Sequence, residues 1–398
     1  MVISDNVAQK SSEVKAMFSD DSCRGTLFRP DLSPQSVCQL VQQVYGLHVI
    51  SCDELDSYDD RNFHITVDSD YDNKHLDQLC PHGYVLKVLN SLDSRKPELT
   101  KVKTDVILHA CQRGFPTPRP VPTTKGQLYS LEVLEREGQS LKASVDTYLV
   151  RLFDYLPGET LASQTLTADL CFEVGQYAGL LDKALKDFDT RTIPELLVKW
   201  NLANVPHLLH MTQFVKDTDK MDILSEVISA FNVQVLQQEA RFQSGIIHSD
   251  FNDYNILVRT TRELPSETHV CGLLDFGDST KSLYVFEVAI AMAYMILKTP
   301  EGCNCDEMAG HVLAGYLSQV QLTKAEVDIL PLVICARFSQ SLILGYHMFS
   351  LDPSNQYTLV HARKVWPHLL HLWQRPVEST LSTWRQIVLR RNIAFPCH

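Results

Sequence analysis

The sequence predicts an α+β protein with two lobes, a small antiparallel β-sheet followed by a larger, mainly helical part. Short runs of alternating apolar residues, typical of half-buried strands, recur through the first lobe. Beyond the Pro157-Gly158 break, apolar residues recur mostly at helical spacing. With 398 residues and 44% hydrophobic content, the chain can bury the cores of two such units. We expect a mobile tail over residues 1–25, one lobe over 26–155 and the other over 156–398.

The first lobe is predicted to begin with a helix and to continue as a sheet. Ser33 is a good N-cap, Pro34 suits the first helical position, and Gly46 suits the position that ends the helix. A second helix over Pro97–Arg113 should end at Gly114. Strands are expected at Val49–Leu55, Asn62–Val67, Tyr84–Leu89, Leu128–Val133 and Tyr148–Phe153.

The second lobe is predicted to be mainly helical. Thr167 is a good N-cap for a helix whose apolar face continues to Phe188. The segment Ser282–Leu297 is apolar nearly all round, so we expect a buried helix in which Glu287 needs a partner.

Further along, Thr323 and Glu326 form a capping box. The helix that they begin is expected to be interrupted near Pro331 and then to run to about His347.

The most informative stretch is Gly245–Lys281. Two short apolar runs bracket a loop in which His248, Asp250 and Asn255 are spaced H-x-D-x-x-x-x-N, and a third apolar run ends at Asp275 in Asp-Phe-Gly. Phosphoryl transfer to a hydroxyl needs a positioned carboxylate to receive the proton and a few hard oxygen ligands for Mg²⁺. Asp250 is predicted to be the catalytic base, and Asn255 and Asp275 the metal ligands.

Each half of this pattern alone is a weaker indication, since Asp-Phe-Gly is often only a turn after a strand. Both halves in order, each at the end of a strand-like run, favour a phosphotransferase. The base role fits Asp250 better than His248, which we interpret as a structural brace of the loop. Glu287 is expected to brace the same loop from its buried helix.

Lys87 lies inside the apolar strand Tyr84–Leu89, where an ammonium is costly unless it is paired or bound to an anion. Its place before a helix favours contact with nucleotide phosphates, and a lysine extended to solvent from an edge strand is the alternative. A kinase would carry a helix glutamate as its partner. Glu98 and Asp105 are the usable acids, and the sequence does not choose between them.

The turn between the first two strands has no glycine, although it occupies the place of a phosphate-covering flap. Backbone amides, Ser57 and Arg61 would have to meet the phosphates, and a plain surface hairpin is the alternative. Further along, the backbone from Phe153 through Tyr155 to Leu156 precedes the break between lobes and is predicted to hydrogen-bond the nucleotide base.

Arg337 lies on the predicted helix after Pro331, in a polar stripe with Gln340 and Ser341. A buried guanidinium needs a carboxylate partner. We expect either an internal aspartate or glutamate, or the carboxylate of a substrate.

Bulk composition narrows the class of protein. A net charge of −12 argues against nucleic acid or an anionic membrane surface as a partner. Eleven cysteines without framework spacing suggest reduced thiols in a cytoplasmic protein, and Cys303 and Cys305 have no evident partners for a zinc site. The N-terminus has no basic and apolar segments of a signal peptide, and no apolar run is long enough to span a bilayer.

These residues resemble the aminoglycoside phosphotransferase and choline kinase superfamily, whose fold is that of protein kinases. Within it, the sequence is similar to the hydroxylysine kinase family. The matching pieces are Ser57–His64, Tyr84–Val88, Gly114–Thr117, Val150–Gly158, Gly245–Asn255, Leu274–Asp278 and Gln340–Leu342.

The resemblance implies phosphorylation of the 5-hydroxyl of free 5-hydroxy-L-lysine in hydroxylysine catabolism, with GTP or ATP as donor, Mg²⁺ as cofactor and a cytoplasmic location. By position it makes Asp250 the base, Asn255 and Asp275 the metal ligands and Lys87 the phosphate contact. The helix glutamate of the family falls on Lys101 here, which is a departure from the pattern. Two other functions stay open: a kinase for choline, ethanolamine or an aminoglycoside, and a catalytically weak nucleotide-binding module.

Overall fold

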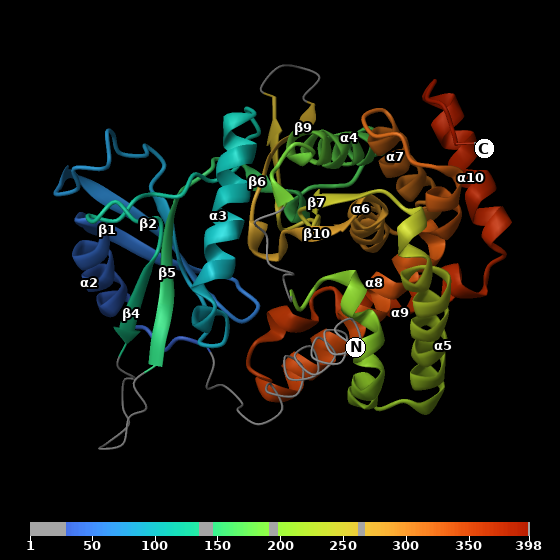
Figure 1. Ribbon diagram of the computed structural model, residues 1–398, viewed down its shortest axis with the longest axis horizontal. Helices are drawn as coiled ribbons and strands as arrows, with labels where there is room; N and C mark the ends of the chain where they lie inside the picture. The colour runs from blue at the N-terminus through green and yellow to red at the C-terminus, as the bar shows by residue number, and fades with distance from the viewer. Residues whose placement is uncertain (1–28, 135–145, 191–197, 262–266, 397–398) are drawn as a thin grey trace, which may run out of the picture. The chain divides into compact units, whose positions relative to one another are not determined.

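The computed structural model describes residues 29–134, 146–190, 198–261 and 267–396 (Figure 1). The predicted tail over residues 1–25 lies outside them. Within the described residues, the chain forms two compact units. One comprises 29–112 and 117–157, and the other comprises 113–116 and 158–396. Residues 113–116, which we expected in the first lobe, thus belong to the larger unit.

The smaller unit contains a five-stranded antiparallel sheet in the order β1-β2-β3-β5-β4. Among the described residues of this unit, two α-helices and one 3₁₀ turn accompany it. Their bounds are α2 Pro34–Tyr45, β1 Leu47–Leu55, β2 Arg61–Tyr71, β3 Tyr84–Val88, η3 Asp93–Arg95, α3 Pro97–Gln112, β4 Ser130–Leu134 and β5 Asp146–Asp154.

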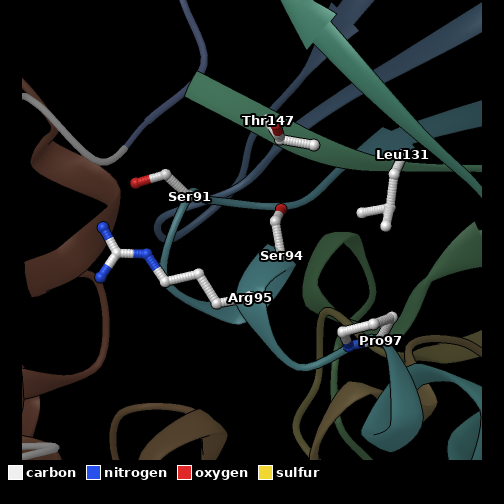
Figure 2. Close-up of a pocket in the computed structure, with 6 residues that line it drawn as sticks. All are labelled: Ser91, Ser94, Arg95, Pro97, Leu131 and Thr147. Carbon is white, nitrogen blue, oxygen red and sulfur yellow. The ribbon is translucent and has the colours of Figure 1, made fainter. Parts of the chain in front are cut away.

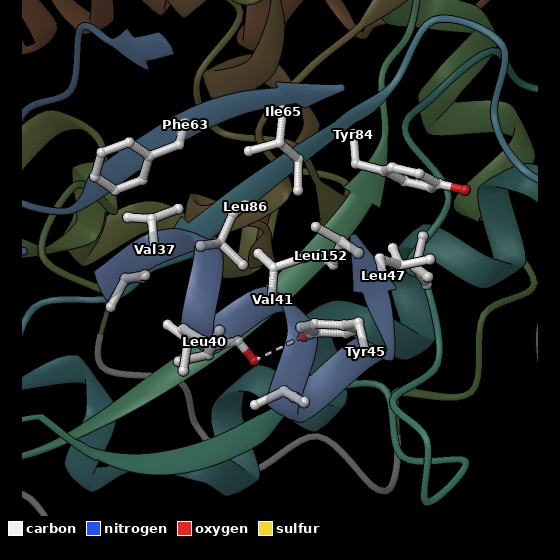
Figure 3. Close-up of a cluster of buried hydrophobic side chains, with 14 of the residues drawn as sticks. Val37, Leu40, Val41, Tyr45, Leu47, Phe63, Ile65, Tyr84, Leu86 and Leu152 are labelled. Carbon is white, nitrogen blue, oxygen red and sulfur yellow. Dashed lines mark hydrogen bonds between the residues drawn. The ribbon is translucent and has the colours of Figure 1, made fainter. Parts of the chain in front are cut away.

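Helix α2 covers one face of this sheet. The side chain of Ser33 accepts a hydrogen bond from the N–H of Ser36, and Gly46 ends the helix with a φ of +66°, a conformation that glycine adopts without strain. Apolar side chains of α2 pack against inward-facing residues of the strands, as Figure 3 shows for Val41 and Leu86. The hydroxyl of buried Tyr45 reaches the carbonyl of Val150 at 3.4 Å.

The other face of the sheet carries charged residues because side chains alternate along a strand. Leu86 and Leu152 enter the α2 core, while Lys87 and Arg151, which are paired between β3 and β5, point the opposite way. The buried guanidinium of Arg151 donates to the hydroxyl of Thr104 on α3. Two cations therefore lie side by side on the α3 face.

The larger unit is mainly helical and also holds two small antiparallel sheets, β6-β8-β9 and β10-β7. Its elements are β6 Glu159–Thr160, η4 Leu161–Ser163, α4 Ala168–Leu185, η6 Leu202–Val215, α5 Thr218–Gln234, η7 Leu236–Arg241, β7 Ser244–Ile247, β8 Ile256–Thr260, β9 Thr268–Leu273, η8 Phe276–Asp278, β10 Thr280–Leu283, α6 Tyr284–Lys298, α7 Cys305–Leu317, α8 Lys324–Leu351, η9 Gln356–Leu359, α9 Ala362–Gln374 and α10 Val377–Arg390.

Glycines allow helices α4 and α7 to approach closely. A Cβ on Gly175 would collide with the carbonyl oxygen of Val312, and one on Gly315 would collide with the carbonyl oxygen of Phe172. The absence of side chains at these two positions therefore lets the two backbones touch.

Helices α6 and α8 form the centre of this unit. Every residue of α6 from Tyr284 to Leu297 is buried, as the sequence predicts. The expected interruption of α8 is wrong, because the helix continues through Pro331. Pro331 is itself buried, and packing on both sides of it outweighs the one hydrogen bond that proline cannot donate.

Helix α8 is long and apolar enough to cross a membrane, but 83% of its most apolar window is buried inside the protein. It is a core helix here. All nine cysteines in the described parts of the chain are free.

Candidate active site

The loop between β7 and β8 presents Asp250 with both carboxylate oxygens hydrogen-bonded. Oδ2 accepts from the side-chain amides of Asn252 at 2.8 Å and Asn255 at 2.7 Å. Oδ1 accepts from Nη2 of Arg337 at 3.0 Å. The carboxylate is thus fixed in one orientation by donors from its own loop and from α8, while its side chain stays 20% exposed. A fixed, accessible carboxylate can receive a proton from a bound hydroxyl.

Arg337 supplies the cation in this arrangement and is itself only 2% exposed. Its guanidinium also donates to the carbonyl of Trp200, to Oε1 of Gln340 and to the hydroxyl of Tyr294. The rings of Trp200 and Tyr294 lie 4.9 Å and 5.4 Å from it. Of the two partners predicted for Arg337, the structure shows the internal carboxylate, so no substrate carboxylate is needed to explain its burial.

His248 connects the Asp250 loop to the Asp275 segment. Its Nε2 donates to the carbonyl of Leu274 at 2.9 Å, and its Nδ1 accepts from the N–H of Asp250 at 3.2 Å. These partners assign the neutral imidazole with the proton on Nε2, because the carbonyl requires a donor and the N–H requires an acceptor. Burial lowers the pKa of His248, although the charges of Asp250 and Asp275 oppose the shift. The structure places His248 between the two segments, and its bracing role stays a prediction.

Glu287 of α6 holds the start of the same loop. Its two carboxylate oxygens accept from the N–H groups of His248 and Ser249, both at 2.8 Å. Burial raises the pKa of Glu287 to about 7. Ser249 has a φ of +70°, which is strained for a residue with a side chain. Two buried acceptors on one carboxylate thus hold a strained backbone in place next to Asp250.

Asn255 and Asp275 offer oxygen atoms at one end of the β8–β9 pair. The N–H of Leu274 donates to the carbonyl of Asn255, which continues the antiparallel pairing and places the residue before β8 beside the residues after β9. Nδ2 of Asn255 is committed to Asp250, so its amide oxygen is the ligand that it can offer. Asp275, with a φ of +49°, uses Oδ1 to accept from the N–H of Gly277. An amide oxygen and a carboxylate are a donor set that suits Mg²⁺.

In the smaller unit, the β1–β2 turn uses its polar side chains internally. The hydroxyl of Ser57 donates to the carbonyl of Asp60 at 2.6 Å and accepts from Arg29 at 3.1 Å. Arg61 makes two hydrogen bonds to Glu54 at 2.8 Å and 2.6 Å. Arg61 is therefore already paired with a carboxylate, and its contact with phosphate stays a prediction. Nucleotide binding by Ser57 stays a prediction.

Lys87 lies beside a carboxylate that was not among the partners expected from the sequence. Its Nζ lies 3.4 Å from Oδ2 of Asp60, and both side chains are mostly buried. Asp105, one of the two expected partners, instead pairs with Lys101 at 3.1 Å on the exposed face of α3. Asp60 thus brings a carboxylate to Lys87 from the β1–β2 turn.

The segment expected to bind the base already uses two of its backbone donors. The N–H of Asp154 donates to the carbonyl of Arg119, and the N–H of Tyr155 donates to the carbonyl of Gly83 at 3.0 Å. The backbone of Phe153 pairs with Pro120 as well as with β3. The N–H of Tyr155 is thus already used within the smaller unit, and binding of the base by the backbone of Phe153 and Tyr155 stays a prediction.

Two other features lie apart from the predicted site residues. A hollow of about 400 Å³ in the smaller unit is lined by Ser94, Arg95 and neighbours but by none of those residues (Figure 2). In the larger unit, Asp306 and His371 approach Cys305, contrary to the expectation that this cysteine has no ligand-type neighbours. Asp306 already forms an ion pair with Arg375, so a metal would have to displace a guanidinium.

Sequence reasoning missed Asn252 and Asp60. Asn252 lies two positions after Asp250, where a short amide can reach back across the loop, and that spacing was the available signal. Asp60 had no such signal, because its contact with Lys87 depends on how β2 and β3 pair.

Comparisons with known proteins agree with this geometry. A family model described as the phosphotransferase enzyme family matches residues 58–321. Hydroxylysine kinase from Xenopus laevis is 34% identical over 364 residues, which cover 89% of this chain and 94% of that protein. Hydroxylysine kinase from Bos taurus is 35% identical over 366 residues, with coverage of 90% and 94%.

Solved structures with little sequence identity share the fold. The structure of amicoumacin kinase hAmiN in complex with AMP-PNP, Ca²⁺ and Ami has a TM-score of 0.59 at 15% identity, with coverage of 87% of this chain and 95% of that one. Choline kinase from Cryptosporidium parvum has a TM-score of 0.53 at 10% identity, with coverage of 90% and 100%. The fold is therefore the bilobal, protein-kinase-like α+β fold that the sequence predicts. The chain belongs to the phosphotransferase enzyme family and transfers a phosphoryl group to an alcohol acceptor.

Proposed function

We propose that the protein transfers the γ-phosphoryl group of GTP, or of ATP, to the 5-hydroxyl of free 5-hydroxy-L-lysine. The choice of acceptor rests on the near full-length similarity to hydroxylysine kinases. The choice of reaction rests on Asp250, a partly exposed carboxylate held by three donors. A cytoplasmic location and a role in hydroxylysine catabolism belong to the same proposal.

In this reaction Asp250 orients the acceptor hydroxyl and receives its proton as the new O–P bond forms. The bond between the γ-phosphorus and the bridging oxygen breaks, and the nucleoside diphosphate leaves. The amides of Asn252 and Asn255 keep the carboxylate pointing one way throughout. Arg337 balances its charge, so that an ionised base can be held in a partly buried place.

Asn255 and Asp275 would hold Mg²⁺ through an amide oxygen and a carboxylate. When bound, the ion neutralises charge on the phosphates of the donor. The strained backbone at Asp275 and the Nδ2 contacts of Asn255 fix the two oxygens before any ion binds.

Acidic and aromatic side chains near Asp250 suit an acceptor with amino groups. Asp253 lies three positions after the base and pairs with His361 at 2.9 Å, and the ring of His361 packs against Tyr294. Burial, with the charge of Asp250 as the next cause, raises the pKa of Tyr357. Ammonium groups are attracted by such carboxylates and ring faces.

The test is a nucleotide-consumption assay with 5-hydroxy-L-lysine and L-lysine as a matched pair, each with GTP and with ATP. Only the hydroxylated amino acid should be phosphorylated, because lysine lacks the oxygen that attacks phosphorus. Choline, ethanolamine and an aminoglycoside complete the panel. If one of these compounds is turned over in preference to hydroxylysine, it would replace hydroxylysine as the proposed acceptor.

The variant Asp250→Asn separates a kinase from a nucleotide-binding module. It keeps the shape of the side chain but removes the base, and it should lower turnover by about 10²–10⁴-fold. Asp328→Asn, which changes an exposed surface pair on α8, serves as the control and should turn over like the parent. Nucleotide binding by the parent without turnover on any acceptor would support the binding module instead.

A further inference from the structure

The carboxylate beside Lys87 comes from an unexpected part of the fold. Protein-kinase-like enzymes place an acid from a helix beside this strand lysine. Here the position expected for that acid carries Lys101, whose side chain is 70% exposed and pairs with Asp105. Asp60, in the turn that joins β1 and β2, lies 3.4 Å from Nζ of Lys87 instead.

The turn holds Asp60 firmly enough to act as a fixed partner. Its Oδ1 accepts from the backbone N–H of Asn90 at 2.8 Å and from the side-chain amide of Asn90 at 3.1 Å. Its carbonyl oxygen accepts from Ser57 and from Arg29. One carboxylate oxygen is thus used to anchor the residue, while the other faces Lys87.

The positive charge on the α3 face of the sheet explains why the carboxylate of Asp60 is important. Lys87 and Arg151 are directly paired neighbours on adjacent strands, and Arg151 is only 5% exposed. Two cations this close repel one another and gain from a carboxylate nearby. The exposed fraction of the Asp60 side chain is 14% and that of Lys87 is 17%, so solvent screens the pair only partly.

We propose that Asp60 is a positioning residue for Lys87: it replaces the missing helix acid and holds the ammonium where a nucleotide phosphate is bound. This inference rests on the proposed nucleotide-binding role of Lys87. It also gives the glycine-free β1–β2 turn a function. The turn supplies a carboxylate to Lys87 instead of forming a flexible flap over the phosphates.

The experiment measures nucleotide affinity by titration of GTP and of ATP with Mg²⁺, in the absence of any acceptor. Asp60→Asn keeps an oxygen for the Asn90 N–H and removes the charge that faces Lys87. We expect nucleotide affinity to fall about five- to tenfold, a typical coupling between charged groups in contact. Asp105→Asn is the matched control, and it should bind nucleotide like the parent because its partner is the exposed Lys101.

A double-mutant cycle with Lys87→Met distinguishes positioning from a general effect on folding. If Asp60 acts through Lys87, the double variant binds nucleotide no more weakly than Lys87→Met alone. Steady-state kinetics on whichever acceptor is active should show a raised KM for nucleotide and an unchanged KM for acceptor. Asp60→Glu, which retains the charge, should recover most of the affinity.

Parent-like nucleotide affinity in Asp60→Asn would overturn the inference, as would losses that simply add in the double variant. Should Asp60→Asn not fold, Asp60→Ser keeps a short acceptor for Asn90 and carries the same expectation. The binding readout needs no acceptor, so an inert hydroxylysine would refute the proposed function and leave this test intact.

Discussion

Nη2 of Arg337 lies 3.0 Å from Oδ1 of Asp250, although 87 positions separate the two residues in the chain. The contact joins the most buried cation of α8 to the carboxylate that we assign as catalytic base. Removing one member of a buried pair leaves the other uncompensated, so the stability of this core and the orientation of the base depend on each other.

Arg337→Met tests this dependence. It should lower the free energy of unfolding by about 3 kcal/mol, the low end for breaking a buried pair because Asp250 keeps some solvent contact. Turnover should fall as well, since one oxygen of the base loses its donor. Denaturant unfolding and initial rates measure the two effects. Lys324→Met on the same helix breaks only an exposed pair with Asp328 and should cost less than about 1 kcal/mol. Equal losses in the two variants would contradict the assignment.

Glu287 and Glu326 form a natural comparison because both are fully buried and both accept backbone hydrogen bonds. Glu287 holds the loop that carries Asp250, whereas Glu326 caps α8 and holds Gln243. Replacing either by glutamine turns one acceptor into a donor and should cost about 1–3 kcal/mol in unfolding free energy. Only Glu287→Gln should also lower kcat. A comparable loss of kcat in Glu326→Gln would remove the special role of Glu287.

The neutral form of His248 predicts how stability depends on pH. Burial lowers the pKa of His248 in the folded protein below its ordinary value of 6.5, so the unfolded chain takes up the proton first as the pH falls. The stability that neutral His248 contributes is complete above pH 6.5 and is lost as the pH falls through its lower folded pKa. The loss should reach at most about 1.4 kcal/mol per pH unit.

His248→Gln provides the comparison, because glutamine can donate to the Leu274 carbonyl but does not titrate. Unfolding free energies of parent and variant should diverge as the pH falls below 6.5, with the parent losing more. Glu287, whose pKa is raised to about 7, contributes with the opposite sign but is present in both proteins. Parallel curves would show that His248 does not titrate as predicted.

Removal of the divalent ion should abolish turnover and weaken nucleotide binding, and both should return when Mg²⁺ is added after chelation. Asp275→Asn tolerates the same backbone conformation but lacks the negative charge, so it should need more Mg²⁺ to reach half-maximal thermal stabilisation by nucleotide. Asn255→Ala should do the same and also loosen Asp250. An unchanged Mg²⁺ dependence in both variants would exclude them as ligands.

Local sequence determined much of this protein. Ser33, Pro34 and Gly46 set the bounds of α2, Thr323 and Glu326 form the predicted capping box, and alternation of apolar residues places β3 and β5. Such features depend on residues within a few positions of one another. The spacing H-x-D-x-x-x-x-N, followed by Asp-Phe-Gly, likewise indicates the phosphotransferase family from the sequence alone.

Only the tertiary structure decided the partners of the charges. Asp60 faces Lys87, Asp250 faces Arg337, and α8 runs through Pro331. The physical reason is the same in each case. The sequence indicates that a buried charge needs a partner. The identity of that partner depends on strand pairing and helix packing between segments far apart in the chain. Packing likewise outweighs the tendency of a single proline, Pro331, to interrupt a helix.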